Sequence, residues 1–169
     1  MFGNWMKHAA QVKAPEGAEQ LEYAVRRELP HADDVTVLVV TAMAGLLGTI
    51  AFADRKYTSD EEARIRAELE RVHGMTEDGI NAICAVLRQH IVEVSTVQAP
   101  RYSRVLLELG DRELRVEVLG LMLEIAAADG KIESKEINVL RQVTTALGLT
   151  QGDYNQLQTK HKDLLAVLK

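Results

Sequence analysis

An internal repeat is the sequence feature that most constrains the fold of this chain. When the sequence is shifted by 75 residues, glycines, acidic residues and apolar positions of one half coincide with those of the other half. The coinciding pairs include Gly45 and Gly120, Ala53 and Ala128, Asp54 and Asp129, Ser59 and Ser134, Glu61 and Glu136, and Arg66 and Arg141. Such copies bury their apolar faces against each other. The repeat therefore predicts two similar units packed about a pseudo-twofold axis.

Apolar residues recur at helical spacing throughout both copies. Residues 35–40, VTVLVV, are the only β-like run, and the apolar segment that continues from them is too long for a strand. Each copy is predicted as a helix, an acidic turn, a second helix, a Gly-x-Thr corner and a third helix. The predicted fold is all-α, a pseudo-twofold bundle of two three-helix repeats in a domain over residues 35–168. Repeat one covers residues 35–96 and repeat two covers residues 111–168. Residues 1–34 are expected to form an N-terminal arm and a short helix.

Several boundaries follow from capping and breaking signals. The second helix of repeat one is expected to start near Ser59, with a capping box from Ser59 to Glu62, and to close at Gly74. The third helix should then carry an unbroken apolar stripe. Residues 95–101, which contain Pro100, are expected to form the clearest loop of the chain. Residues 1–15 are expected to contribute little to the fold.

Residues 35–53 contain no charged side chain and are nearly long enough to span a bilayer as a helix. The corresponding segment of the second copy, RELRVEVLGLMLEIAAA, carries several charges and is an ordinary amphipathic helix. The repeat therefore favours a central core helix that is apolar all round because it is covered all round. A transmembrane helix remains the alternative.

Composition excludes several classes of partner. The 169 residues suit one domain, and 25 acidic residues outnumber 20 Lys and Arg. Aromatic residues make up 4% of the chain. Because nucleic-acid binders need basic surfaces and bases stack on aromatic rings, no nucleic-acid partner is expected. Cys84 is the only cysteine, so neither an internal disulfide nor a cysteine-based zinc site is available.

Catalytic signatures are missing from the sequence. The five histidines are scattered without an HExxH pattern, no glycine-rich phosphate loop follows a strand, and no nucleophile motif occurs. The chain is therefore expected to have no enzymatic activity and no small-molecule substrate. The start of the chain lacks a secretory signal, and a cytoplasmic location is expected.

The two acidic turns carry the sequence's main chemical signal. The second turn contains Asp129, Gly130 and Glu136, which match the last eight positions of an EF-hand calcium loop, although the acids of the first half are missing. The first turn keeps the seven-residue spacing between Asp54 and Glu61 but has Arg55 in the place of the glycine.

If the copies pack about a twofold axis, the two turns can share their carboxylates. The predicted metal ligands are Asp129, Glu136, Glu133, Asp54, Glu61 and Glu62. Such an all-oxygen set favours calcium or magnesium, with zinc or manganese as less favoured cations. Helix capping is the competing interpretation, because acidic residues also stabilise the first turn of a helix. The two interpretations stay open at this point.

Residues 119–154, LGLMLEIAAADGKIESKEINVLRQVTTALGLTQGDY, resemble the TerB family of tellurite-resistance proteins. The resemblance rests on a small-residue helix, an A-x-D-G turn, a Glu seven residues after the Asp, and the A-L-G-L-T corner. Residues 49–76 are similar but weaker. The resemblance implies an all-helical pseudo-symmetric bundle, acidic turn residues that bind a divalent metal, and a partner-binding role in membrane-associated stress-response complexes.

The expected function is divalent-cation binding coupled to protein–protein interaction in tellurite or stress resistance. The expected location is the cytoplasm, including a peripheral position at the inner face of the membrane, and a homodimer is compatible with the sequence. The alternative is a metal-free helical scaffold or a co-chaperone-type interaction domain. The convergence of Asp54 and Asp129 on one site is the feature that distinguishes the two.

Overall fold

The computed structural model describes residues 19–72, 75–96, 99–128 and 130–160, and within these residues it contains helices and no strands. The all-helical prediction is therefore confirmed. In chain order the helices are α1 (Glu19–Glu28), α2 (Asp34–Ala51), α3 (Ser59–Leu69), α4 (Glu77–Thr96), α5 (Ala99–Leu109), α6 (Arg112–Ala127), α7 (Ser134–Ala146) and α8 (Gln151–Thr159).

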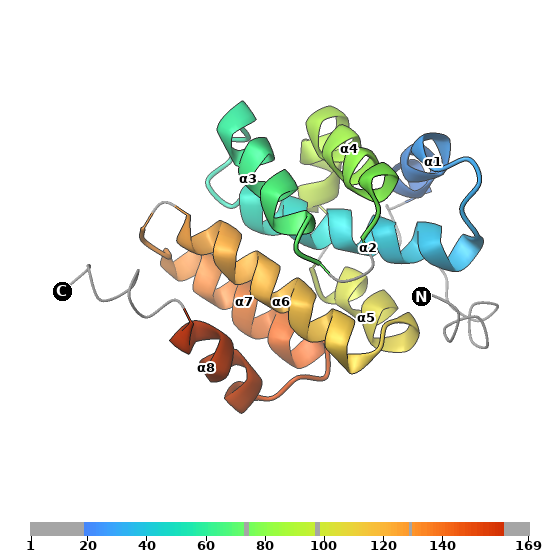
Figure 1. Ribbon diagram of the computed structural model, residues 1–169. Helices are drawn as coiled ribbons and strands as arrows, with labels where there is room; N and C mark the ends of the chain where they lie inside the picture. Colours follow the sequence, from blue (N-terminus) through green and yellow to red (C-terminus); the bar gives the residue numbers. More distant parts are fainter. Residues whose placement is uncertain (1–18, 73–74, 97–98, 129, 161–169) are drawn as a thin grey trace.

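Helix α2 lies at the centre of the fold (Figure 1). Its N-cap is Asp33, whose side chain accepts a 2.7 Å hydrogen bond from the Thr36 amide. Fifteen of its eighteen residues are buried, which confirms the prediction of a core helix. By length and composition α2 is also a candidate membrane span, and 83% of that span is buried inside the protein. Its apolar surface is therefore already covered by other helices of this fold.

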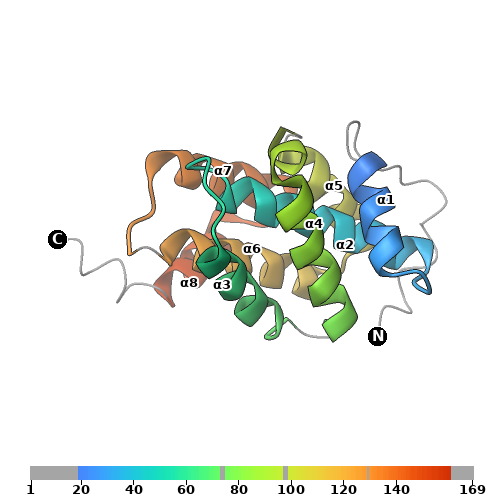
Figure 2. The same ribbon diagram turned by 90° about the horizontal axis from the view of Figure 1, so that it is seen from above.

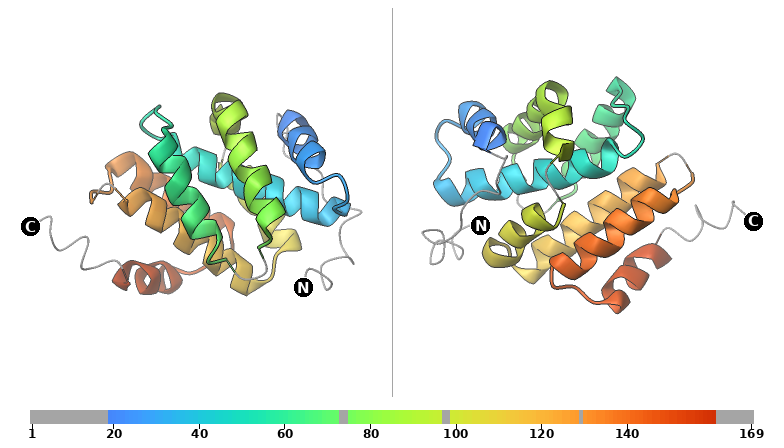
Figure 3. Two further views of the ribbon diagram at one scale, coloured as in Figure 1. Left: turned by 45° about the horizontal axis from the view of Figure 1, so that its top comes forward. Right: turned by 180° about the vertical axis from the view of Figure 1, so that it is seen from behind.

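The other helices form layers on two sides of α2. Helices α1 and α4 pack against α2 from one side, and α3 packs beside α4 (Figures 1 and 2). Helices α5 and α6 contact α2 from the opposite side, α7 packs on α5 and α6, and α8 packs on α6. Helix α6 also contacts α3. The segments after α2 and after α6 are thereby brought to the same end of the molecule (Figure 3).

The expected loop at residues 95–101 is wrong at the residues of this segment that the structure describes, since residues 97 and 98 lie outside them. Helix α4 extends to Thr96, and α5 already begins at Ala99. Pro100 is the second residue of α5, a position where the missing N–H has no partner within the helix and the fixed φ angle suits the helical backbone. Ala99 and Tyr102 are buried, so packing of this first turn against the core outweighs the loop signal that Pro100 gives in the sequence.

The second helix of repeat one starts at Ser59 as expected, but its N-cap and its end differ from the prediction. Thr58, not Ser59, is the N-cap of α3, and the helix ends at Leu69 rather than continuing to Gly74. The predicted unbroken stripe of α4 is also interrupted, because His90 has non-helical angles (φ −132°, ψ 25°). Leu87 before this kink and Val94 after it are both still buried. The kink therefore redirects α4 without removing its apolar side chains from the core.

The helices of the two predicted copies are α2, α3 and α4 in the first and α6, α7 and α8 in the second. Helices α1 and α5 lie outside this scheme, and α5 packs against both α2 and α7. The predicted arm, residues 1–15, lies outside the described residues, as do residues 161–169 at the other end. Leu21 and Val25 anchor α1 in the core with no exposed surface.

Candidate functional site at the two acidic turns

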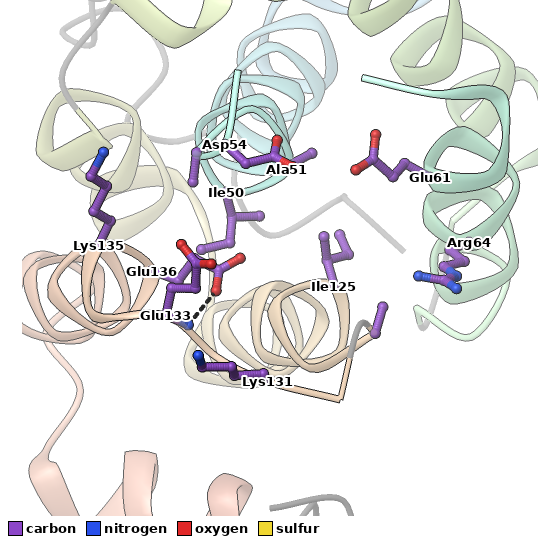
Figure 4. A pocket seen from close by; sticks show the side chains of 12 residues that line it. Ile50, Ala51, Asp54, Glu61, Arg64, Ile125, Lys131, Glu133, Lys135 and Glu136 are labelled. Carbon is purple, nitrogen blue, oxygen red and sulfur yellow. Dashed lines mark hydrogen bonds between the residues drawn. The ribbon is translucent and has the colours of Figure 1, made fainter. Parts of the chain in front are cut away.

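The two acidic turns line one pocket, with a volume of about 70 Å³. This volume is large enough for several water molecules or a small hydrated ion. Four of the six predicted metal ligands line it: Asp54, Glu61, Glu133 and Glu136 (Figure 4). The remaining lining residues are Ile50, Ala51, Ala53, Arg64, Ile125, Ala128, Lys131 and Lys135. Described residues of both turns therefore line the same pocket, while the expected meeting of Asp54 with Asp129 involves a residue outside the described part of the chain.

Residues that correspond in the repeat meet across this pocket. Three pairs of lining residues are each 75 positions apart: Ile50 and Ile125, Ala53 and Ala128, and Glu61 and Glu136. The apolar members lie at or just after the C-terminal ends of α2 and α6, while the two glutamates stand in the first turns of α3 and α7. The repeat visible in the sequence therefore brings equivalent positions to a single site.

In the first turn, the carboxylates also accept hydrogen bonds from backbone amides. The Thr58 amide donates to Glu61 Oε2 at 2.6 Å, and the Glu61 amide donates to Thr58 Oγ1 at 3.2 Å. These reciprocal bonds form a capping box at the start of α3. Asp54 Oδ1 accepts a 2.9 Å bond from the Lys56 amide and so stabilises the turn itself. The capping interpretation of these acids is correct, with Glu61 rather than Glu62 in the box.

The second turn has the same arrangement. The Glu133 amide donates to Glu136 Oε2 at 2.7 Å, and Glu133 and Glu136 together form a capping box at the start of α7. Gly130 has a left-handed backbone (φ 76°), and its counterpart Arg55 adopts nearly the same angle (φ 63°). The first turn has therefore kept the bend although it lost the glycine. Asp129, the first acid of the second turn, lies outside the described residues.

Glu62 does not join the pocket. Its carboxylate pairs with the Arg88 guanidinium of α4, with Arg88 Nε donating to Glu62 Oε2 at 3.1 Å and Arg88 Nη2 donating to Oε1. This pair raises the pKa of Arg88 and joins α3 to α4. Tyr57 lies near this pair, and burial raises its pKa. Glu62 therefore has a structural role, and its prediction as a neighbouring ligand is not supported by its position.

Sequence reasoning missed the basic side chains that face the acids. Arg64, Lys131 and Lys135 line the pocket together with the four carboxylates (Figure 4). Arg64 lies one helical turn after Glu61, so the spacing of three residues was the signal that could have placed it on the same face. Arg55, which stands in place of the glycine in the first turn, is not among the lining residues. The pocket is thus mixed in charge.

The donor chemistry suits a hard cation, but the carboxylates stand apart. Within the described residues, no group of three or more His, Cys, Asp or Glu side chains could hold a metal ion. Each of Asp54, Glu61 and Glu136 is also hydrogen-bonded to a nearby backbone amide. An ion in this pocket would therefore be bound only if the two turns drew closer together.

The profile of the family described as tellurite resistance protein TerB matches residues 40–159. This match covers more than half of the chain and includes both acidic turns. The chain belongs to the TerB family. No curated protein and no solved structure matches the chain significantly. Membership of the TerB family confirms the resemblance found in the sequence and agrees with the all-helical fold.

Proposed function

We propose that this TerB-family chain is a non-enzymatic module that binds a divalent cation at the turn pocket and interacts with protein partners in tellurite or stress resistance. The observation that carries the proposal is the meeting of Glu61 and Glu136 at one pocket, although they are 75 residues apart. Because residues of both turns line this pocket, their carboxylates can act on one ion there.

Calcium or magnesium is the preferred cation, since both take carboxylate and carbonyl oxygens. Zinc and manganese are the less favoured candidates. The residues that would hold the ion are Glu136, Glu61, Asp54 and Glu133, together with Asp129. In this proposal the ion draws the turns together and links α3 to α7. The ion would then lie between equivalent turns of the two copies, which the repeat predicts to be related by a pseudo-twofold axis.

A metal-free helical scaffold is the second candidate function. It is favoured by the capping bonds of Glu61 and Glu136 and by the basic residues Arg64, Lys131 and Lys135, which offset the negative charge of the pocket without any ion. In this case the acids stabilise helix ends, and interaction with partners, including co-chaperone-type partners, is the whole function.

The proposed partners are proteins, including a membrane-associated complex at the inner face of the membrane, and the proposed location is the cytoplasm. A homodimer is a further arrangement compatible with the proposal. We expect this chain to bind its partner through a rigid helical surface, without a catalytic residue taking part. Affinity isolation of the tagged chain from tellurite-treated and untreated cells, with and without chelator, tests whether partner binding follows the cation.

Calorimetric titration distinguishes the two candidate functions. Metal-stripped protein is titrated with calcium, magnesium, zinc and manganese in turn, and its melting midpoint is recorded at each concentration. If the cation binds only the folded state, an excess of about a hundredfold over the dissociation constant adds about 2.7 kcal/mol to the free energy of unfolding. If none of the four ions produces binding heat or raises the melting midpoint, the cation-binding proposal is wrong and the metal-free scaffold is the remaining candidate function.

Three variants locate the ion. Glu136→Gln removes a charge but retains the oxygen that accepts the Glu133 amide, so metal-dependent stabilisation should largely disappear while metal-free stability changes little. Glu61→Gln should weaken the effect less, since the second turn has the more complete calcium-type loop. Glu62→Gln is the matched control: it removes an adjacent charge that faces Arg88, and metal-dependent stabilisation should persist.

A further inference from the structure

Three pairs of residues that are equivalent in the repeat line the turn pocket, but its lysines do not belong to such pairs. The equivalent of Lys131 is Lys56, and the equivalent of Lys135 is Asp60, each 75 positions earlier. Neither Lys56 nor Asp60 is among the described residues that line the pocket. Both lysines of the pocket therefore come from the second copy, the one with the more complete calcium-type loop.

Lys131 and Lys135 lie next to the acids of the second turn. Lys131 follows Gly130 in the turn, and Lys135 is the second residue of α7. In Figure 4 the carboxylates of Glu133 and Glu136 lie between the two lysine side chains. Both lysines are exposed to solvent, so each can move away from the pocket without disturbing the core. Their positive charges thus lie beside carboxylates that the proposed ion would use.

The charges of the pocket are nearly balanced within the chain. Four carboxylates and three basic side chains line its described part, which gives a net charge of −1. Without the two lysine charges the same lining would carry −3. Oxygen-ligand sites set their affinity for divalent cations partly by the number of charged ligands. Two ammonium groups next to these ligands also repel an approaching cation, an effect that salt screens where the groups are exposed.

We infer that Lys131 and Lys135 act as built-in counter-ions of the turn pocket, which lower its affinity for a divalent cation and are displaced when the cation binds. This inference rests on the proposed function, because it concerns the regulation of the same pocket. The lysines balance the carboxylates in the metal-free protein. The pocket therefore fills only when the cation concentration is high enough to displace them.

Titration of metal-stripped protein with magnesium chloride and, separately, with calcium chloride tests the inference. The double variant Lys131→Met/Lys135→Met keeps apolar stems at both positions and removes both charges. We expect its dissociation constant to be about tenfold lower than that of the wild type, and that of the single variant Lys131→Met to be about threefold lower. Raising the sodium chloride concentration should narrow the difference, since salt screens the lysine charges.

Lys56→Met is the matched control. It makes the same change in net charge at the equivalent position of the first turn, outside the described lining, and it retains the Lys56 amide that donates to Asp54. Its dissociation constant should stay within about twofold of the wild-type value. Adding Glu136→Gln to the double variant should remove most of the gain, because the tighter binding must occur at the pocket. Thermal unfolding without metal checks that every variant is folded.

The outcomes separate this inference from the proposed function. If the wild type binds and the double variant binds no more tightly, or if Lys56→Met tightens binding as much as Lys131→Met does, the inference is wrong and the proposed function stands. If only the double variant binds, the lysines limit the affinity as inferred, and the proposed function fails for the wild-type chain. If neither protein binds either ion, both the inference and the proposed function are wrong.

Discussion

The ring of Tyr102 on α5 occupies the space beside Gly45 on α2. A Cβ atom added at Gly45 would lie 2.5 Å from ring atoms Cδ1, Cε1 and Cζ of Tyr102, which is itself fully buried. The glycine therefore allows α5 to approach the central helix closely. Gly120, the equivalent residue in the repeat, has no such neighbour, and its added Cβ would make an ordinary contact with Leu157.

These two equivalent glycines should respond to alanine in opposite ways. Gly45→Ala forces the buried ring to shift, and we expect it to lower the free energy of unfolding by about 1–3 kcal/mol. Gly120→Ala should raise it by about 0.5–1 kcal/mol, because alanine is the better helix former and the space is available. Urea denaturation of both variants measures the difference. Similar effects at the two positions would contradict the close packing at Gly45.

The hydroxyl of Tyr102 is a buried polar group with no hydrogen-bond partner among the described residues. Burial also raises its pKa to about 12. Because an unsatisfied buried hydroxyl is destabilising, Tyr102→Phe should raise the free energy of unfolding by about 1 kcal/mol. Tyr154→Phe is the matched control: its hydroxyl accepts a 3.2 Å bond from Gln158 Nε2, and its loss should be neutral or destabilising.

The internal repeat predicted part of the fold and the equivalence of two acidic residues that line the pocket. It predicted that α2 is a buried helix despite its resemblance to a membrane span, and that Glu61 and Glu136 occupy equivalent positions. Long, periodic segments are predictable in this way because each one buries its own apolar face. The contact of Gly45 with Tyr102 was not predictable, since it depends on how closely α5 approaches α2.

The mistakes in the site have a common physical cause. Glu62 was grouped with the turn acids because it is adjacent to Glu61 in sequence, but neighbouring helical residues point about 100° apart, and Glu62 faces Arg88 instead. Arg64 was missed although it lies one turn from Glu61 on the same face. Which partner each α3 side chain meets depends on the tertiary packing of α3 against its neighbouring helices, and the sequence does not show that packing.

Arg55 provides a test of the strain in the first turn. It has a left-handed backbone (φ 63°) at the position where the second turn has Gly130. Because this conformation is unfavourable for a residue with a Cβ atom, Arg55→Gly should raise the free energy of unfolding by about 1 kcal/mol. Gly130→Ala should lower it by a similar amount, although a Cβ at Gly130 meets no atom within 4 Å. Thermal unfolding in the absence of metal checks both, and equal stability of all three proteins would exclude strain at this angle.

The stability of the capping box at the start of α8 should depend on pH through the Asp153 carboxyl. The pKa of this carboxyl is lowered, first by the hydrogen bond from the Thr150 amide at 2.8 Å, and also by the Arg112 guanidinium, which donates to Oδ1 at 2.6 Å. A carboxyl with a lowered folded-state pKa stabilises the fold fully above its unfolded pKa, about 3.9, and this contribution is lost as the pH falls through the folded value. The capping box at Thr150 should therefore open only as the pH falls through the lowered folded-state pKa of Asp153.

An NMR pH titration measures this opening directly. The Asp153 carboxyl carbon should titrate below the ordinary aspartate range, and the Thr150 amide should shift with the same midpoint because it donates to that carboxylate. Arg112→Gln should move the midpoint upward but leave it below the ordinary value, since the bond from the Thr150 amide has the larger effect on the pKa. A full return to the ordinary aspartate pKa in Arg112→Gln would assign the effect to the ion pair, and the capping bond would then have no measurable part in it.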